Sequence, residues 1–243
     1  MDIHVSHVHK YFDQHHVIKD VTLTIPSGEI CGLLGPSGSG KTTLIRLMIG
    51  AIAADEGSVH FGDVEIPNMN MLKKVGFMPQ NDALYDDLSA EANLHFFGGL
   101  YHLDSSTLNK RMDEVLSIVD LTEHRKKLVK KFSGGMKKRL SLAAAILHSP
   151  KILFLDEPTV GIDPVLRRAI WQQFQTIKQS GTTIIVSTHV MDEVTECDQA
   201  ALLYNGALID YDTVPNLIQK TDNGRVEELF LMASAQAKEG ERS

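Results

Sequence analysis

The feature that most constrains this chain is one glycine-rich stretch, Gly35-Pro36-Ser37-Gly38-Ser39-Gly40-Lys41-Thr42-Thr43. It follows the apolar run 30–34 and precedes residues 44–49, which have helical periodicity, so a buried strand, a loop and a helix start stand consecutively. The spacing matches G-x-x-x-x-G-K-[ST], in which glycines let backbone N–H groups close on an anion at the positive end of a helix. Lys41 is expected to bind the β- and γ-phosphates, and the Thr42 hydroxyl to bind Mg²⁺. A plain Gly/Ser linker has no use for Lys-Thr at the helix start. The stretch therefore predicts a nucleoside triphosphate site.

Composition narrows the class of protein. At 243 residues and 43% hydrophobic content, the chain can bury a sizeable core, either as one large domain or as a core with a lobe. The net charge of −7 argues against a nucleic-acid surface. Two cysteines, Cys31 and Cys197, form no disulfide framework, which predicts a reducing compartment, and Cys31 reads as a small core residue. The sequence shows no signal peptide and no apolar run near the ~18 residues of a spanning helix, so any membrane passage is expected to belong to another chain.

The N-terminal segment, residues 1–29, reads as two strands and a turn. Tyr11 and Phe12 are expected in that turn, where an exposed aromatic ring serves either ordinary packing or as a platform for a purine base. Histidines crowd the segment at positions 4, 7, 9, 15 and 16. Solvated strand faces explain them, and a metal site is the alternative.

A second anion-binding helix start is predicted at Ser133-Gly134-Gly135. Ser133 reads as the N-cap of an apolar-faced helix. Two glycines in a first turn cost roughly 1 kcal/mol each relative to alanine. Capping does not need them, whereas close approach of the backbone to a phosphate does.

Polar side chains follow the ends of two apolar strands. The run 152–155 ends in Asp156 and Glu157, and the β-branched run 182–187 is followed by His189. Ligands in parallel sheets bind beyond the carboxyl ends of the strands. Asp156 is therefore predicted to hold Mg²⁺, Glu157 to polarise an attacking water and His189 to face the γ-phosphate.

The remaining segments complete an α/β chain. Short strands are expected at 58–61, 64–66 and 75–78, a helical block at 89–119, and a hairpin at 200–211 around Asn205-Gly206. Asp163-Pro164 is expected to open a helix, with an acidic N-cap and proline at the first position. The tail is expected to contain an apolar helical fragment at 226–231, followed by a polar end.

Together these segments resemble the ATPase subunit of ABC transporters over nearly the whole chain. Gly35 to Thr43 resembles the Walker A loop, Ser133 to Gly135 the signature motif, and Ile152 to Glu157 the Walker B strand with its catalytic glutamate. Further matches are Gln80 as the Q-loop glutamine, Asp163 in the D-loop, His189 as the switch histidine and Tyr11 as the adenine-stacking aromatic.

The resemblance implies a RecA-like P-loop core with an antiparallel β lobe and an inserted α-helical lobe. The expected division is 1–86 with 151–220 for the core and β lobe, 87–150 for the helical lobe, and 221–243 for the tail. One departure is Met136, where the signature most often has glutamine. Met136, the segment 160–164 and the segment 227–231 resemble the drug- and lipid-export branch.

The function implied is hydrolysis of ATP with Mg²⁺ by a dimer, either a homodimer or a pair of ABC subunits, in which each signature completes the opposite site. A separate membrane permease is expected to contact the surface near Gln80–Leu88, which places the protein at the cytoplasmic face of the membrane, and Gln80 to contact the metal and relay closure. Two rivals stay open. A soluble ABC-type ATPase usually carries two cassettes or a long insertion, and a P-loop kinase does not need Glu157 followed by a switch histidine.

Overall fold

The computed structural model describes residues 1–240 and divides into two compact units. The first unit combines Met1–Leu72 with the chain from Ile185 onward, and the second is Lys73–Ile184. This division follows compactness. The lobe boundaries expected from the sequence stay a prediction.

The first unit contains an antiparallel sheet in the order β2-β1-β4-β5. Its strands are β1 (Ile3–Phe12), β2 (His15–Ile25), β4 (Glu56–Phe61) and β5 (Val64–Ile66). The two predicted N-terminal strands are confirmed, and apolar side chains alternate into the core along β2. The predicted position of Tyr11 and Phe12 in the turn is wrong. Both end β1, and Tyr11 pairs with His16 of β2, because the hairpin turn needs only residues 13 and 14.

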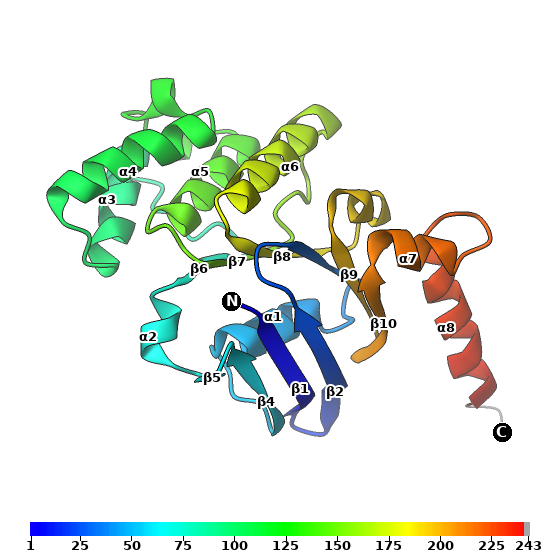
Figure 1. The fold of residues 1–243 in the computed structure, drawn as a ribbon. Helices are drawn as coiled ribbons and strands as arrows, with labels where there is room; N and C mark the ends of the chain where they lie inside the picture. The colour runs from blue at the N-terminus through cyan, green and yellow to red at the C-terminus, as the bar shows by residue number, and fades with distance from the viewer. Residues whose placement is uncertain (241–243) are drawn as a thin grey trace. The chain divides into compact units, whose positions relative to one another are not determined.

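The same unit also holds parallel strands that lead to the glycine-rich loop. Strand β3 (Ile30–Leu34) lies parallel to β9 (Gln199–Tyr204), which forms the predicted hairpin with β10 (Ala207–Thr213). The helical elements are α1 (Lys41–Ile49), α2 (Met69–Leu72), α7 (Val214–Gln219), α8 (Glu227–Gly240) and the 3-10 turn η3 (Met191–Glu196). Helix α1 begins directly after the loop and contacts β2 (Figure 1). The expected fragment 226–231 lies largely within α8, which continues further, while residues 241–243 lie outside the described part of the chain.

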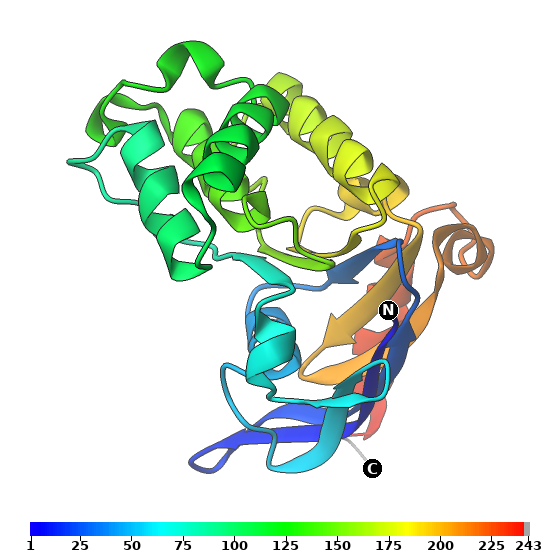
Figure 2. The same ribbon diagram turned by 60° about the vertical axis from the view of Figure 1, so that its left-hand side comes forward.

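The second unit packs helices on parallel strands. Strands β6 (Val75–Met78) and β7 (Ile152–Asp156) pair in parallel, and every residue of β7 is buried. The helical elements are α3 (Ala90–Leu100), α4 (Ser105–Ile118), η1 (Thr122–His124), η2 (Val129–Lys131), α5 (Gly134–Ile146) and α6 (Pro164–Gln179). In Figures 1 and 2, α3 to α6 gather on one face of β6 and β7. The helical block expected at 89–119 is α3 and α4.

The boundary between the two units falls inside strand β8 (Thr183–Thr188). Strand β8 therefore appears in both units: the strand order is β10-β9-β3-β8 in the first and β8-β7-β6 in the second. Parallel strands joined by helices match the predicted α/β fold class. Across residues 1–240, no helix has the length and apolarity needed to cross a bilayer.

Candidate nucleotide site

The glycine-rich loop joins the end of β3 to the start of α1 in the geometry expected of a phosphate cradle. Gly40 is the N-cap of α1 with φ 103°, a conformation that favours glycine, and it has no side chain with which to cap the helix. A Cβ on Gly35 would lie 2.2 Å from the carbonyl oxygen of Leu203, so only glycine fits there. No side chain therefore caps the N–H groups in the first turn of α1. An uncapped helix N-terminus attracts an anion.

Two side chains of the loop also indicate a ligand. Lys41 is 5% exposed, and its Nζ donates to the carbonyl oxygens of Gly35 at 2.8 Å and Pro36 at 3.0 Å. The Ser39 side chain is 2% exposed, and its Oγ has no hydrogen-bond partner within residues 1–240. A buried hydroxyl of this kind costs free energy unless something bonds to it, and a phosphate oxygen would do so. Residues 36–38 form the exposed rim of the loop.

Tyr11 is tied to the same loop through β2. Its backbone N–H donates to Asp55 Oδ2 at 2.6 Å, and its side chain is partly exposed. Its pairing partner His16 precedes Val17, whose carbonyl oxygen lies 3.1 Å from the position of a Cβ on Gly40. The Tyr11 ring of β1 thus lies beside β2, the strand whose Val17 packs against the phosphate loop.

In the second unit, the predicted acids end β7 and one of them contacts Gln80. Asp156 is 2% exposed at the last position of β7, and Glu157 follows with φ 50°. Gln80 Nε2 donates to Glu157 Oε2 at 2.9 Å across 77 residues of sequence. This bond fixes the carboxylate and turns the amide oxygen of Gln80 away from it. The structure thus brings together two predicted site residues that lie far apart in the chain.

The predicted signature residues occupy the exposed start of α5. Ser133 is its N-cap, as expected, and its Oγ accepts from Met136 N at 3.3 Å. A Cβ on Gly134 would meet nothing within 4 Å, so this glycine leaves open space. A Cβ on Gly135 would lie 2.3 Å from Leu166 Cδ2, so this glycine allows close packing against the Leu166 side chain of α6. The phosphate contact expected of both glycines stays a prediction.

The remaining predicted residues lie at a helix start and a strand end. Asp163 is the N-cap of α6, as expected, and its Oδ1 accepts from the N–H groups of Val165 and Leu166. His189 directly follows β8 in the first unit and is exposed. Cys31 is fully buried, and burial raises its pKa to about 12, in line with a core residue.

Sequence reasoning assigned no role to Lys138. Its Nζ donates to the Gln80 carbonyl oxygen and lies 3.7 Å from Asp82 Oδ1, so it ties α5 to the segment after β6. No spacing rule connects positions 58 residues apart, so only the structure reveals this contact.

An apolar pocket of about 290 Å³ lies beside this segment in the second unit. We call it the Q-loop pocket; its lining residues are Phe77, Pro79, Ala83, Leu84, Phe97, Leu100, Tyr101, Ser141, Ala144 and Ala145. Exposed apolar side chains of the same region include Tyr85, Leu88 and Leu100. The pocket overlaps the surface at which the sequence predicts a membrane partner.

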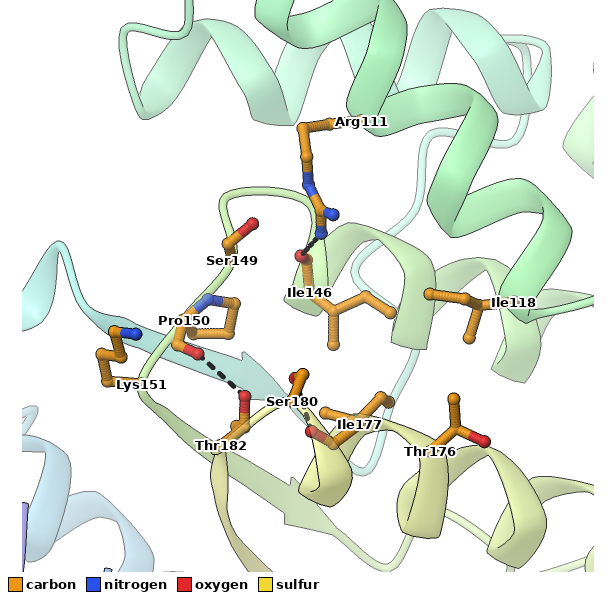
Figure 3. Close-up of a pocket in the computed structure, with 10 residues that line it drawn as sticks. All are labelled: Arg111, Ile118, Ile146, Ser149, Pro150, Lys151, Thr176, Ile177, Ser180 and Thr182. Atoms are coloured by element: carbon orange, nitrogen blue, oxygen red, sulfur yellow. Dashed lines mark hydrogen bonds between the residues drawn. The ribbon is translucent and has the colours of Figure 1, made fainter. Parts of the chain in front are cut away.

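A second cavity of about 290 Å³ contains none of the predicted site residues (Figure 3). Arg111 donates to the carbonyl oxygens of Ile146 and Leu147, and Thr182 Oγ1 donates to that of Pro150. These polar groups bond to the backbone, so they stabilise the ends of elements rather than offering a ligand site.

Taken separately, the two units carry the parts of a P-loop nucleoside triphosphatase. One has the phosphate loop and its lysine, and the other has strand-end acids with a glutamine in contact. Comparison with known proteins narrows this class.

The profile of the family described as ABC transporter matches residues 18–160, more than half of the chain. The chain is 36% identical over 243 residues to the Linearmycin resistance ATP-binding protein LnrL of Bacillus subtilis (strain 168), covering 95% of the chain and 78% of that protein. It is 37% identical to ABC transporter G family member 20 of Dictyostelium discoideum, covering 94% of the chain but 32% of that protein. A solved structure described as the ATP binding subunit of an ABC transporter superposes with a TM-score of 0.84 at 24% identity, covering 96% of the chain and all of that structure, which shows the fold.

The chain belongs to the ABC transporter family. It is an ATP-binding subunit that hydrolyses ATP, and its fold is that of the ABC ATPases.

Proposed function

We propose that this ATPase acts as a dimer, binds ATP with Mg²⁺ at sites shared between two subunits, and drives export through a separate membrane-spanning subunit. The observation that carries the proposal is the 2.9 Å hydrogen bond from Gln80 to Glu157. It links the group proposed to activate water to the segment beside the Q-loop pocket. The names of LnrL and of the Daunorubicin resistance ATP-binding protein DrrA3, which is 32% identical to this chain, favour a drug-like cargo.

The nucleotide is proposed to bind along the first unit. The loop Gly35–Thr43 wraps the phosphates with backbone N–H groups, and Lys41 leaves its carbonyl partners for the β- and γ-phosphate oxygens. The orphaned Ser39 hydroxyl gains an acceptor. The exposed face of Tyr11 takes the adenine ring.

The residues proposed to hold Mg²⁺ each offer an oxygen donor. These are the Thr42 hydroxyl, the Asp156 carboxylate and the Gln80 amide oxygen, which the bond from Nε2 to Glu157 turns away from that carboxylate. A hard cation prefers such oxygen ligands and keeps waters and phosphate oxygens as the others. When bound, Mg²⁺ neutralises charge that develops on the phosphates.

Glu157 is proposed to accept a proton from the attacking water. It follows the buried β7 directly, and the bond from Gln80 to its Oε2 holds the carboxylate in a fixed orientation. His189, at the end of β8, is proposed to contact the γ-phosphate.

Dimer formation is proposed to complete each site. Ser133 and Gly134 are exposed at the start of α5, and the open space over Gly134 leaves room for a phosphate of the opposite subunit. Asp163 is proposed to lie at the same interface. Loss of the γ-phosphate on hydrolysis removes these contacts and opens the dimer.

The membrane subunit is proposed to dock at the Q-loop pocket. Its lining is largely apolar, and it adjoins the predicted contact surface Gln80–Leu88. A short helix with apolar side chains fits such a groove. The protein would then act at the cytoplasmic face of the membrane.

Membrane sedimentation tests this docking. Leu100→Glu places a charge in the pocket, where Leu100 is 60% exposed, and should shift the chain from the membrane pellet to the supernatant while leaving ATP binding intact. Met69→Glu is the matched control, since Met69 is 76% exposed on α2 of the other unit. A parent chain that never sediments with membranes would favour the soluble ABC ATPase instead.

A further inference from the structure

Three aromatic rings form a stack at the end of the β1–β2 hairpin. The His9 and His16 rings lie 5.3 Å apart between centroids with an interplanar angle of 16°. The His16 and Tyr11 rings lie 4.1 Å apart at 14°. Tyr11 is 39% exposed, so the stack ends in a ring that is open to solvent. Tyr11 thus rests on a support that the rest of the hairpin provides.

A hydrogen bond holds the support in place. His9 Nδ1 and His16 Nε2 are 3.1 Å apart, so one ring nitrogen donates and the other accepts. The bond fixes the orientation of the His16 ring that lies against Tyr11.

We infer that His16 is a positioning residue that holds the Tyr11 ring, the proposed platform for the base of ATP. His16 holds the plane of the Tyr11 ring, and it connects directly to Val17, whose carbonyl packs against Gly40 of the phosphate loop. The ring plane is thereby set relative to the phosphates before ATP arrives. The inference rests on the proposed function, because the contact of Tyr11 with adenine is itself proposed there.

Other charged groups around the stack fall into two sets. On the backbone side, Asp55 accepts from Tyr11 N and from Lys10 Nζ, and these donors hold its pKa below the usual range, so this anchor is charged at neutral pH. On the ring side, Asp20 bonds to His7 Nδ1 at 2.8 Å, and Glu56 of β4 pairs in register with His9.

A pair of ligands separates base binding from phosphate binding. Mg-ATP and Mg-tripolyphosphate are titrated by calorimetry, and the ratio of their Kd values reports the contribution of the nucleoside. His16→Ala should raise the Kd for ATP roughly 2- to 10-fold, the range for one aromatic contact, and leave that for tripolyphosphate unchanged. His16→Phe keeps a flat ring beside Tyr11, so the ratio of its two Kd values should be close to that of the parent. His15→Ala, an exposed neighbour on the same strand, is the control, and its ratio of Kd values should equal that of the parent.

The outcomes separate this inference from the proposed function. If Tyr11→Ala changes the ratio but His16→Ala does not, Tyr11 binds the base and the positioning role of His16 is overturned. If neither variant changes the ratio, the adenine platform itself is wrong. An equal effect of His15→Ala overturns the specific role of His16.

Discussion

Glu157 combines a strained backbone with a fixed side chain. Its φ of 50° lies in the left-handed region that residues with side chains rarely adopt, at a cost of order 1–3 kcal/mol. The strain persists because β7 is buried on one side of the residue and Gln80 bonds to its carboxylate. A residue held this way keeps its carboxylate oriented, which suits a general base.

Glu157→Gln should separate binding from hydrolysis. The amide still offers an oxygen to Gln80 but cannot take a proton from water, so hydrolysis should fall about 10²- to 10⁴-fold while Mg-ATP still binds. Phosphate release measures the rate, and light scattering with and without ATP should detect a stable closed dimer. Glu227→Gln, at the exposed start of α8, is the control. Parental hydrolysis by Glu157→Gln would assign the proton transfer to another group, with His189 the next candidate.

At the scale of elements, three helix starts differ in how their positive ends are compensated. Asp163 caps α6 with a carboxylate, Ser133 caps α5 with a neutral hydroxyl, and Gly40 precedes α1 with no side chain at all. A helix end that already has a negative charge attracts a phosphate less than an uncharged one. The helix starts proposed to meet phosphate are the two without an acidic cap.

Two substitutions at Ser133 should separate helix capping from phosphate contact. Asn and Asp are both good N-caps, so Ser133→Asn and Ser133→Asp should keep α5 equally stable. Only the Asp variant adds a negative charge at the proposed γ-phosphate contact. It should abolish the ATP-induced dimer in size-exclusion chromatography, while ATP binding to its own loop persists and the Asn variant still dimerises. Equal dimerisation by both variants would remove Ser133 from the shared site.

At the scale of the whole molecule, protonation of His148 makes the free energy of unfolding depend on pH. This ring stacks on Tyr101 at 3.6 Å between centroids, and its Nε2 lies 3.0 Å from the Val75 carbonyl oxygen. Burial, with a further contribution from the Arg111 charge, lowers the pKa of His148 to about 4. The folded state therefore favours the neutral ring, and the unfolded state binds the proton first as pH falls.

The free energy of unfolding should thus fall as the pH is lowered from about 6.5 to about 4. His148 contributes at most roughly 3 kcal/mol to this loss, and solvent screening reduces that contribution. His148→Phe keeps the stack with Tyr101 and should flatten that part of the profile. Denaturant unfolding without nucleotide at pH 7 and near pH 4.5 measures the difference. Parallel profiles for the parent and His148→Phe would contradict the assignment.

Much of the local structure could be predicted because short-range chemistry dictates it. The strand 30–34, the loop and the helix after it follow from an apolar run, three glycines and a lysine. The caps Ser133 and Asp163 follow from their side chains. Tyr11 was misplaced because a two-residue turn let β1 extend two positions further, and α2 and α7 are too short for periodicity to reveal.

By itself, the sequence determined the fold class, the family and the positions of the phosphate loop, the strand-end acids and the two capped helix starts, because each depends on residues adjacent in the chain. Only the tertiary structure decided that Gln80 bonds to Glu157, that Leu166 of α6 packs against Gly135, and that histidines support Tyr11. These contacts join residues brought together by strand pairing and helix packing. Many sequence separations satisfy such packing equally well, so no spacing in the sequence reveals it.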